Sequence, residues 1–132
     1  MKTPLRFLAL ICVVFGVAGL ARAGDITGTW QSEFDSQIGV QKYVFTFKVE
    51  GEKLTGTAAG DRSGNKSSVA IQQGKVTKDS VYFVETLNFQ GQDLVIEYTG
   101  KVTGDNEIKF TRKVGDFATE EIVARRVPGK QP

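Results

Sequence analysis

Residues 41–56 read QKYVFTFKVEGEKLTG, and this stretch decides the fold. Tyr43, Phe45 and Phe47 alternate with smaller or more polar residues, which is the period-two pattern of a strand with one buried face. A glycine-containing turn at 50–52 follows, and a second alternating run begins directly after it. The stretch therefore predicts an antiparallel hairpin whose aromatic face points into a core.

The same pattern extends in both directions, from Ile26 to Val127, and no segment shows a helical stripe. Short connections predict that neighbouring strands pair antiparallel, and eight such strands most simply close into an up-and-down all-β barrel filled by side chains. A two-sheet sandwich is the alternative. The polar segment 61–67 is expected to be the longest loop. The expected strands are Ile26–Phe34, Gln41–Val49, Leu54–Ala59, Ser68–Val76, Ser80–Phe89, Asp93–Val102, Glu107–Val114 and Ala118–Val127.

The N-terminal residues 1–23 have the pattern of a signal peptide. Lys2 and Arg6 precede an apolar run, and Ala21-Arg22-Ala23 supplies the small-x-small pattern that a signal peptidase reads. We therefore expect cleavage before Gly24, a barrel domain over 24–127, a short tail over 128–132, and a secreted or periplasmic location.

Composition excludes several kinds of chemistry. The chain has no histidine, and its only cysteine, Cys12, lies within the expected leader. Serine–histidine hydrolysis and zinc, copper or haem sites need these side chains, so we expect no metal and no cofactor.

The net charge of +2 also depends on the leader, which contains three Lys or Arg residues and no acid, so removing it leaves −1. A nearly neutral surface gives no electrostatic argument for nucleic acid, or for a membrane after cleavage. We expect a monomer.

Two carboxylates on adjacent expected strands are the weak catalytic candidates. Glycoside hydrolysis requires only two such groups, and Glu85 lies on the apolar face of its strand, where its proton could be retained. Glu97, however, has the opposite phase from its apolar neighbours. We favour the alternative that Glu85 forms a buried or barrel-mouth salt bridge with Arg112, which also lies on an apolar face.

Ligand-binding candidates are few. Tyr82 has the outward phase of its strand and could stack on a sugar ring, and Arg112 is the inward cation. Strand alternation places Glu121 with Arg125, and it likewise places Glu120 with Arg126. These pairs are either surface ion pairs or a polar ligand-binding patch that includes Glu121.

Gly28-Thr29-Trp30 on the first strand resembles the Gly-x-Trp motif of lipocalin-like (calycin) barrels. The resemblance implies that the tryptophan closes one end of the barrel beneath an arginine of the last strand. Arg125 and Arg126 are the candidates here, since a guanidinium stacked on an indole closes that end and can bond open carbonyls.

The chain from 25 to 127 also resembles a small exported bacterial barrel domain that occurs alone or beside secreted xylanases, esterases and glycosidases. The segments that carry this resemblance are 25–30, 43–48, 54–57, 98–102, 108–110 and 114–118. Together with the leader and the missing catalytic side chains, this resemblance favours a non-catalytic binding or accessory module, with a polysaccharide, a small ligand or a secreted enzyme as partner. Alternatives are a lipocalin-like carrier of a small apolar compound, which requires an open cavity, a carboxylate-based glycoside hydrolase, and a small enzyme inhibitor.

Overall fold

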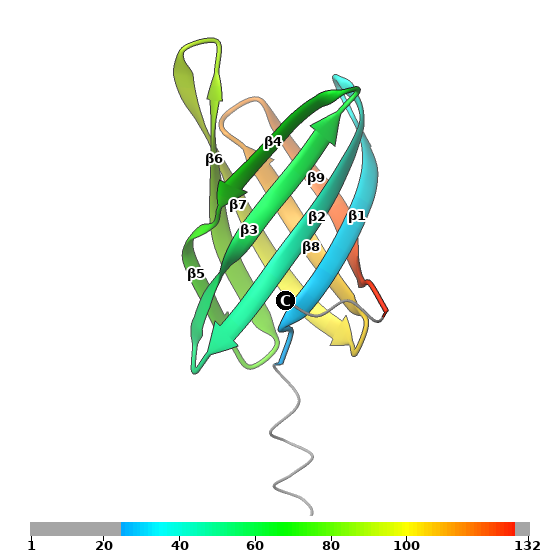
Figure 1. The fold of residues 1–132 in the computed structure, drawn as a ribbon, viewed down its shortest axis with the longest axis vertical. Helices are drawn as coiled ribbons and strands as arrows, with labels where there is room; N and C mark the ends of the chain where they lie inside the picture. The colour runs from blue at the N-terminus through cyan, green and yellow to red at the C-terminus, as the bar shows by residue number, and fades with distance from the viewer. Residues whose placement is uncertain (1–24, 129–132) are drawn as a thin grey trace, which may run out of the picture.

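The computed structural model describes residues 25–128, so the expected leader and residues 129–132 of the tail lie outside the described part of the chain (Figure 1). All regular structure within 25–128 is β-strand. No helical segment in this range has the length and apolar character of a membrane span.

Nine strands follow one another along the chain. They are β1 (Gly28–Ser36), β2 (Gly39–Glu50), β3 (Lys53–Arg62), β4 (Asn65–Ala70), β5 (Gln72–Thr77), β6 (Ser80–Phe89), β7 (Gln92–Gly104), β8 (Glu107–Val114) and β9 (Ala118–Arg126).

Every strand pair is antiparallel, and the sheet closes on itself. β1, β2, β3, β5, β6, β7, β8 and β9 form the ring, while β4 pairs with the far half of β3 (Figure 1). The predicted eight-stranded antiparallel barrel is therefore confirmed, with one additional strand.

Two sequence-based boundaries were wrong. The expected strand Ser68–Val76 is divided at Ile71 into β4, which pairs with β3, and β5, which pairs with β6 and shifts its register between Gln72 and Lys75. The expected loop 61–67 is instead a hairpin with a two-residue turn at Ser63-Gly64. Polar residues occupy both strands of this hairpin, and a polar strand is hard to distinguish from a loop in sequence.

Aromatic rings fill the middle of the barrel. Phe83 stacks on Tyr98 with ring centroids 4.4 Å apart, and Phe45 meets both rings edge-on. These side chains lie on the inward phase that the alternation predicted, and they confirm that the middle is filled. The fully buried rings are Trp30, Tyr43, Phe45, Phe47, Phe83, Tyr98 and Phe110.

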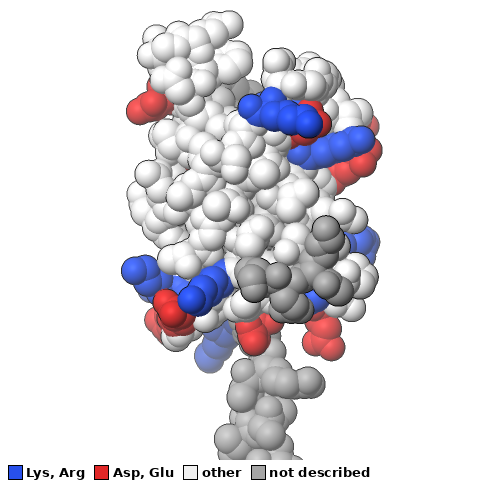
Figure 2. All heavy atoms as spheres, viewed as in Figure 1, with Lys and Arg blue, Asp and Glu red and all other residues white. Residues whose placement is uncertain are grey.

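The two ends of the barrel differ. At the end that we call the open end lie the β1–β2, β3–β4, β6–β7 and β8–β9 turns (Figure 1). At the closed end lie the other turns and both ends of the described chain. Figure 2 shows that the charged side chains of one face gather toward these two ends, while its middle is uncharged.

The ring is closed by few backbone pairs at two places, between β3 and β5, which share only Lys53–Lys75, and between β1 and β9. β1 and β9 share only the pairs Trp30–Arg126 and Gln31–Arg125, both near the closed end. Farther along this seam lies a surface recess of about 560 Å³, which Glu121 and Arg125 help to line. The hydroxyl of Ser32, another residue that lines the recess, is buried without a hydrogen-bond partner among the described residues.

Candidate functional site

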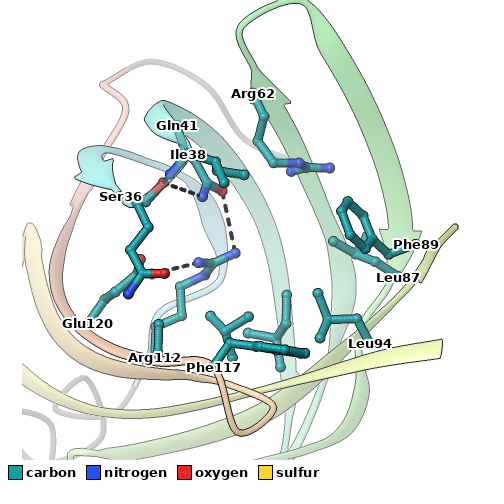
Figure 3. A pocket seen from close by; sticks show the side chains of 14 residues that line it. Ser36, Ile38, Gln41, Arg62, Leu87, Phe89, Leu94, Arg112, Phe117 and Glu120 are labelled. Atoms are coloured by element: carbon teal, nitrogen blue, oxygen red, sulfur yellow. Dashed lines mark hydrogen bonds and ion pairs between the residues drawn. The ribbon is translucent and has the colours of Figure 1, made fainter. Parts of the chain in front are cut away.

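A cavity of about 270 Å³ occupies the open end of the barrel, above the aromatic core (Figure 3). Fourteen residues from seven strands and two turns line it. They are Ser36, Gln37, Ile38, Gln41, Arg62, Leu87, Phe89, Leu94, Ile96, Arg112, Val114, Phe117, Ala118 and Glu120.

One side of the cavity is apolar. Leu87 and Phe89 are inward residues at the end of β6, and Leu94 is an inward residue at the start of β7. Phe117 of the β8–β9 turn lies beside them (Figure 3). Inward-facing apolar residues of β6 and β7 continue past the filled middle of the barrel. No aromatic ring from the opposite strands packs against them there, so they form a wall of the cavity.

The opposite side is polar and centres on Arg112, whose side chain is only 3% exposed. Its Nη1 donates to Glu120 Oε1 at 2.7 Å, and its Nε donates to the Tyr98 hydroxyl at 2.8 Å. Its Nη2 donates to the Tyr43 hydroxyl at 3.2 Å, with a longer contact of 3.5 Å to Gln41 Oε1. Arg112 is thus fixed by partners on three other strands, β2, β7 and β9, and its charge is balanced by Glu120.

Glu85 lies beneath Arg112 and is fully buried. The hydroxyls of Tyr43 and Tyr98 each donate to one of its carboxylate oxygens, both at 2.7 Å. Burial raises the pKa of Glu85 above its ordinary value, while the two hydroxyl donors and Arg112 act in the opposite direction. Burial, followed by the nearby Glu85, also raises the pKa of Tyr43 to about 12, so this hydroxyl keeps its proton and serves as a donor.

The prediction that Glu85 forms a salt bridge with Arg112 was wrong. Both side chains are buried in one network, but two tyrosine hydroxyls stand between them. The reason is register, since Arg112 lies opposite Tyr98 on one side and opposite Glu120 on the other, whereas Glu85 lies opposite Ile96.

Arg62, the last residue of β3, reaches into the cavity from the side (Figure 3). Its Nη1 donates to the Tyr43 hydroxyl at 3.2 Å, and its Nη2 donates to Ser67 Oγ at 2.7 Å. None of the ion pairs among residues 25–128 includes Arg62.

At the closed end, the predicted tryptophan–arginine contact is present, and its arginine is Arg126. The Arg126 guanidinium lies 4.6 Å from the Trp30 ring and donates to the carbonyls of Asp25, Thr27 and Asp105. A Cβ on Gly28 would lie 3.0 Å from Arg126 Nη1, so glycine leaves room for this contact. Arg125 points outward and pairs with Glu107 instead.

The expected pairs within β9 were also wrong. Glu120 pairs with Arg112 rather than Arg126, and Glu121 accepts a hydrogen bond from Thr111 rather than pairing with Arg125. Along an extended strand, residues four or six apart are separated by about 13–20 Å. Cross-strand neighbours are much nearer, so the β8–β9 register decides these partners.

The structure separates the two weak catalytic candidates. Glu97 lies on the outer face, where the Tyr82 hydroxyl approaches it at 3.4 Å, while Glu85 is buried inside. Tyr82 has the predicted outward orientation but is half-buried. Neither Tyr82 nor Glu97 reaches the cavity. Within residues 25–128, no group of three or more Asp, Glu, His or Cys side chains is placed to hold a metal ion.

Sequence reasoning missed Arg62, Gln41 and Glu120 as cavity residues. Gln41 follows the inward phase of Tyr43 and Phe45, so continuing that alternation by one step could have found it. Arg62 was assigned to a loop, and Glu120 was assigned to a pair along its own strand. The first error came from the polar composition of 61–67, and the second from strand register, which a single sequence does not specify.

Comparisons of this chain with protein-family models, with curated proteins and with solved structures find no match.

Proposed function

We propose that this protein is a non-catalytic binding module that holds a small, largely apolar organic ligand in the open end of its barrel. The observation that carries the proposal is the cavity of about 270 Å³, apolar on one side and lined on the other by a fixed network around Arg112. Ligand sites in proteins are typically apolar hollows with a few well-placed polar groups. The cavity is just below the range of about 300–1,000 Å³ that drug-sized ligands occupy, which favours a smaller molecule.

The filled middle limits what such a module can bind. Tyr43, Phe47, Phe83 and Phe110 are all buried there, so a carrier with a deep central cavity has no room for its ligand. The ligand is therefore held at the end of the barrel, with the apolar side chains of Ile38, Phe89 and Phe117 exposed around it.

Two features support the lipocalin-like resemblance and the expected location outside the cytoplasm. The contact between Trp30 and Arg126 supports the resemblance to lipocalin-like barrels, and the leader pattern supports a location outside the cytoplasm. Association with polysaccharide breakdown rests on the second resemblance alone, and Tyr82, its candidate stacking residue, is half-buried on the outer face.

A neutral apolar dye, N-phenylnaphthylamine, tests the proposal. We expect saturable one-to-one binding with enhanced emission. Ala118→Phe should abolish it, because Ala118 lines the cavity and the added ring would fill it. Val123→Phe on the outer face of the same strand is the matched control and should bind like the parent.

Thermal unfolding followed by circular dichroism should show that both variants remain folded. The proposal is overturned if the parent protein shows no saturable dye binding, or if folded Ala118→Phe binds the dye as well as the parent does.

A further inference from the structure

We infer that the ligand of the open end is an amphipathic monoanion, with its acidic head on Arg62 and its apolar body against β6, β7 and Phe117. This inference rests on the proposed function, because it names the chemical class of the ligand for the same cavity.

The first argument is the two-sided lining of the cavity. Ser36, Gln41, Arg112 and Glu120 lie together on one side, whereas Leu87, Leu94 and Phe117 lie on the other (Figure 3). A wholly apolar ligand would displace water from the polar side without replacing its hydrogen bonds. The loss of those hydrogen bonds costs binding free energy in a partly desolvated site. An amphipathic ligand matches both sides.

The second argument is the charge on the polar side. Glu120 is engaged by Arg112 at 2.7 Å, and Glu85 lies below the cavity, fully buried and hydrogen-bonded to two tyrosines. Of the charged side chains that line the cavity, Arg62 is the one whose guanidinium bonds only hydroxyl groups within the described chain. The lining therefore contains two guanidinium groups and one carboxylate.

The third argument is the geometry of Arg62. Two of its nitrogen atoms donate one bond each, to Tyr43 and Ser67, and a guanidinium has five N–H donors. Donors therefore remain for a further acceptor beside the cavity. A planar guanidinium matches a carboxylate through two parallel bonds, and such charge-assisted bonds are roughly twice as strong as neutral ones.

The apolar rim suggests where the far end of the ligand lies. Phe117 is 75% exposed, Ile38 is 65% exposed and Phe89 is 57% exposed, and all three line the cavity from three separate turns or strand ends. A flexible apolar chain that starts at Arg62 would cover the inner apolar wall first and then this rim.

Isothermal titration calorimetry with three ligands of the same chain length tests the inference on the intact protein. The probes are octanoate, octan-1-ol and octylammonium. We expect octanoate to bind at least about tenfold more tightly than octan-1-ol, and octylammonium to bind most weakly.

Arg62→Gln should lower the affinity for octanoate to that for octan-1-ol. Arg125→Gln, which removes an outward-facing guanidinium, is the matched control and should preserve the preference. Chemical shifts of the backbone amides and of the Trp30 indole N–H should report where octanoate binds. We expect changes at Leu94 and Phe117 and none at the Trp30 indole of the closed end.

The possible failures are distinguishable. If octan-1-ol binds at the open end as tightly as octanoate, the anion preference is wrong and the proposed function stands. The inference is also overturned if Arg62→Gln retains the full preference for octanoate. If no member of the series binds at the open end, both the inference and the proposed function are rejected.

Discussion

Two arginines, Arg126 and Arg112, lie at opposite ends of the barrel and use their guanidinium groups differently. Arg126 stacks on Trp30 and bonds three backbone carbonyls, so it ties the N-terminal segment to the last strand and the β7–β8 turn. Arg112 bonds side chains only, and it fixes the polar side of the cavity. The first interaction closes the barrel, and the second shapes a site within it.

Arg126→Ala should lower the free energy of unfolding by about 2 kcal/mol, because it removes a cation–π contact and three charge-assisted hydrogen bonds in a half-exposed setting. The emission of Trp30, the only tryptophan, should shift to the red as its ring becomes hydrated. Arg125→Ala, at the adjacent exposed position, should change stability by no more than about 0.5 kcal/mol. Chemical denaturation followed by indole emission measures both effects. Equal, small losses in the two variants would show that Arg126 does not close this end.

The buried Glu85 predicts a pH dependence of stability. Its pKa in the folded protein is raised above the ordinary value of 4.5 by burial. As the pH rises past that value, the unfolded chain releases the proton first, so the folded state holds more protons and the free energy of unfolding falls. We expect the contribution of Glu85 to be most favourable at acidic pH and to decrease as the pH rises toward the raised pKa.

Denaturation curves at several pH values between about 4 and 8, with Glu85→Gln beside the parent, test this prediction. The glutamine variant should lose the part of the slope that belongs to Glu85. Glu97→Gln, the same chemical change on the outer face of the adjacent strand, should leave the slope unchanged. Parallel curves for the parent and Glu85→Gln would contradict the prediction.

At the scale of elements, the sequence predicted strands well and cross-strand partners poorly. The aromatic alternation around Phe45 correctly predicted which face is buried, because a period of two has only two phases. The partner of Arg112 depends on the registers of the β7–β8 and β8–β9 pairs, and a single sequence does not specify those registers. The cavity itself could not be predicted, since it lies where inward side chains from different strands fail to meet.

The break between β4 and β5 shows how local geometry changes an element. Gln73 has a φ of 55°, and the pairing with β6 shifts register around it. The adjacent Gly74 lies directly against β3, where a Cβ would come 2.1 Å from the carbonyl oxygen of Leu54. Only glycine allows the two backbones to approach this closely, although its sequence context resembles that of an ordinary turn glycine.

Gly74→Ala should therefore destabilise the protein by about 2 kcal/mol or more, because backbone atoms cannot move aside as a flexible side chain could. Gly104→Ala is the matched control, since a Cβ there meets nothing within 4 Å. Thermal unfolding of the two variants under the same conditions gives the comparison. Similar melting temperatures for both would mean that β5 does not lie against β3 as described.

At the scale of the whole molecule, the barrel has one closed end, a filled middle and one open end. The closed end and the middle use Trp30 and a set of stacked and edge-on rings, which are the largest of the fully buried side chains. At the open end, the walls continue beyond the rings and leave a hollow bordered by turns. The proposed binding function depends on this asymmetry.

Thiol accessibility at two inward positions tests this asymmetry most directly. Single cysteines replace Leu94, which lines the cavity, and Val81, which is buried in the filled part, in a Cys12→Ser background that has no other thiol. We predict that Leu94→Cys reacts readily with a small thiol reagent in the folded protein, and that Val81→Cys reacts only at the rate of unfolding. Equal protection of both positions, or equal reactivity, would contradict a barrel that is filled in the middle and hollow at one end.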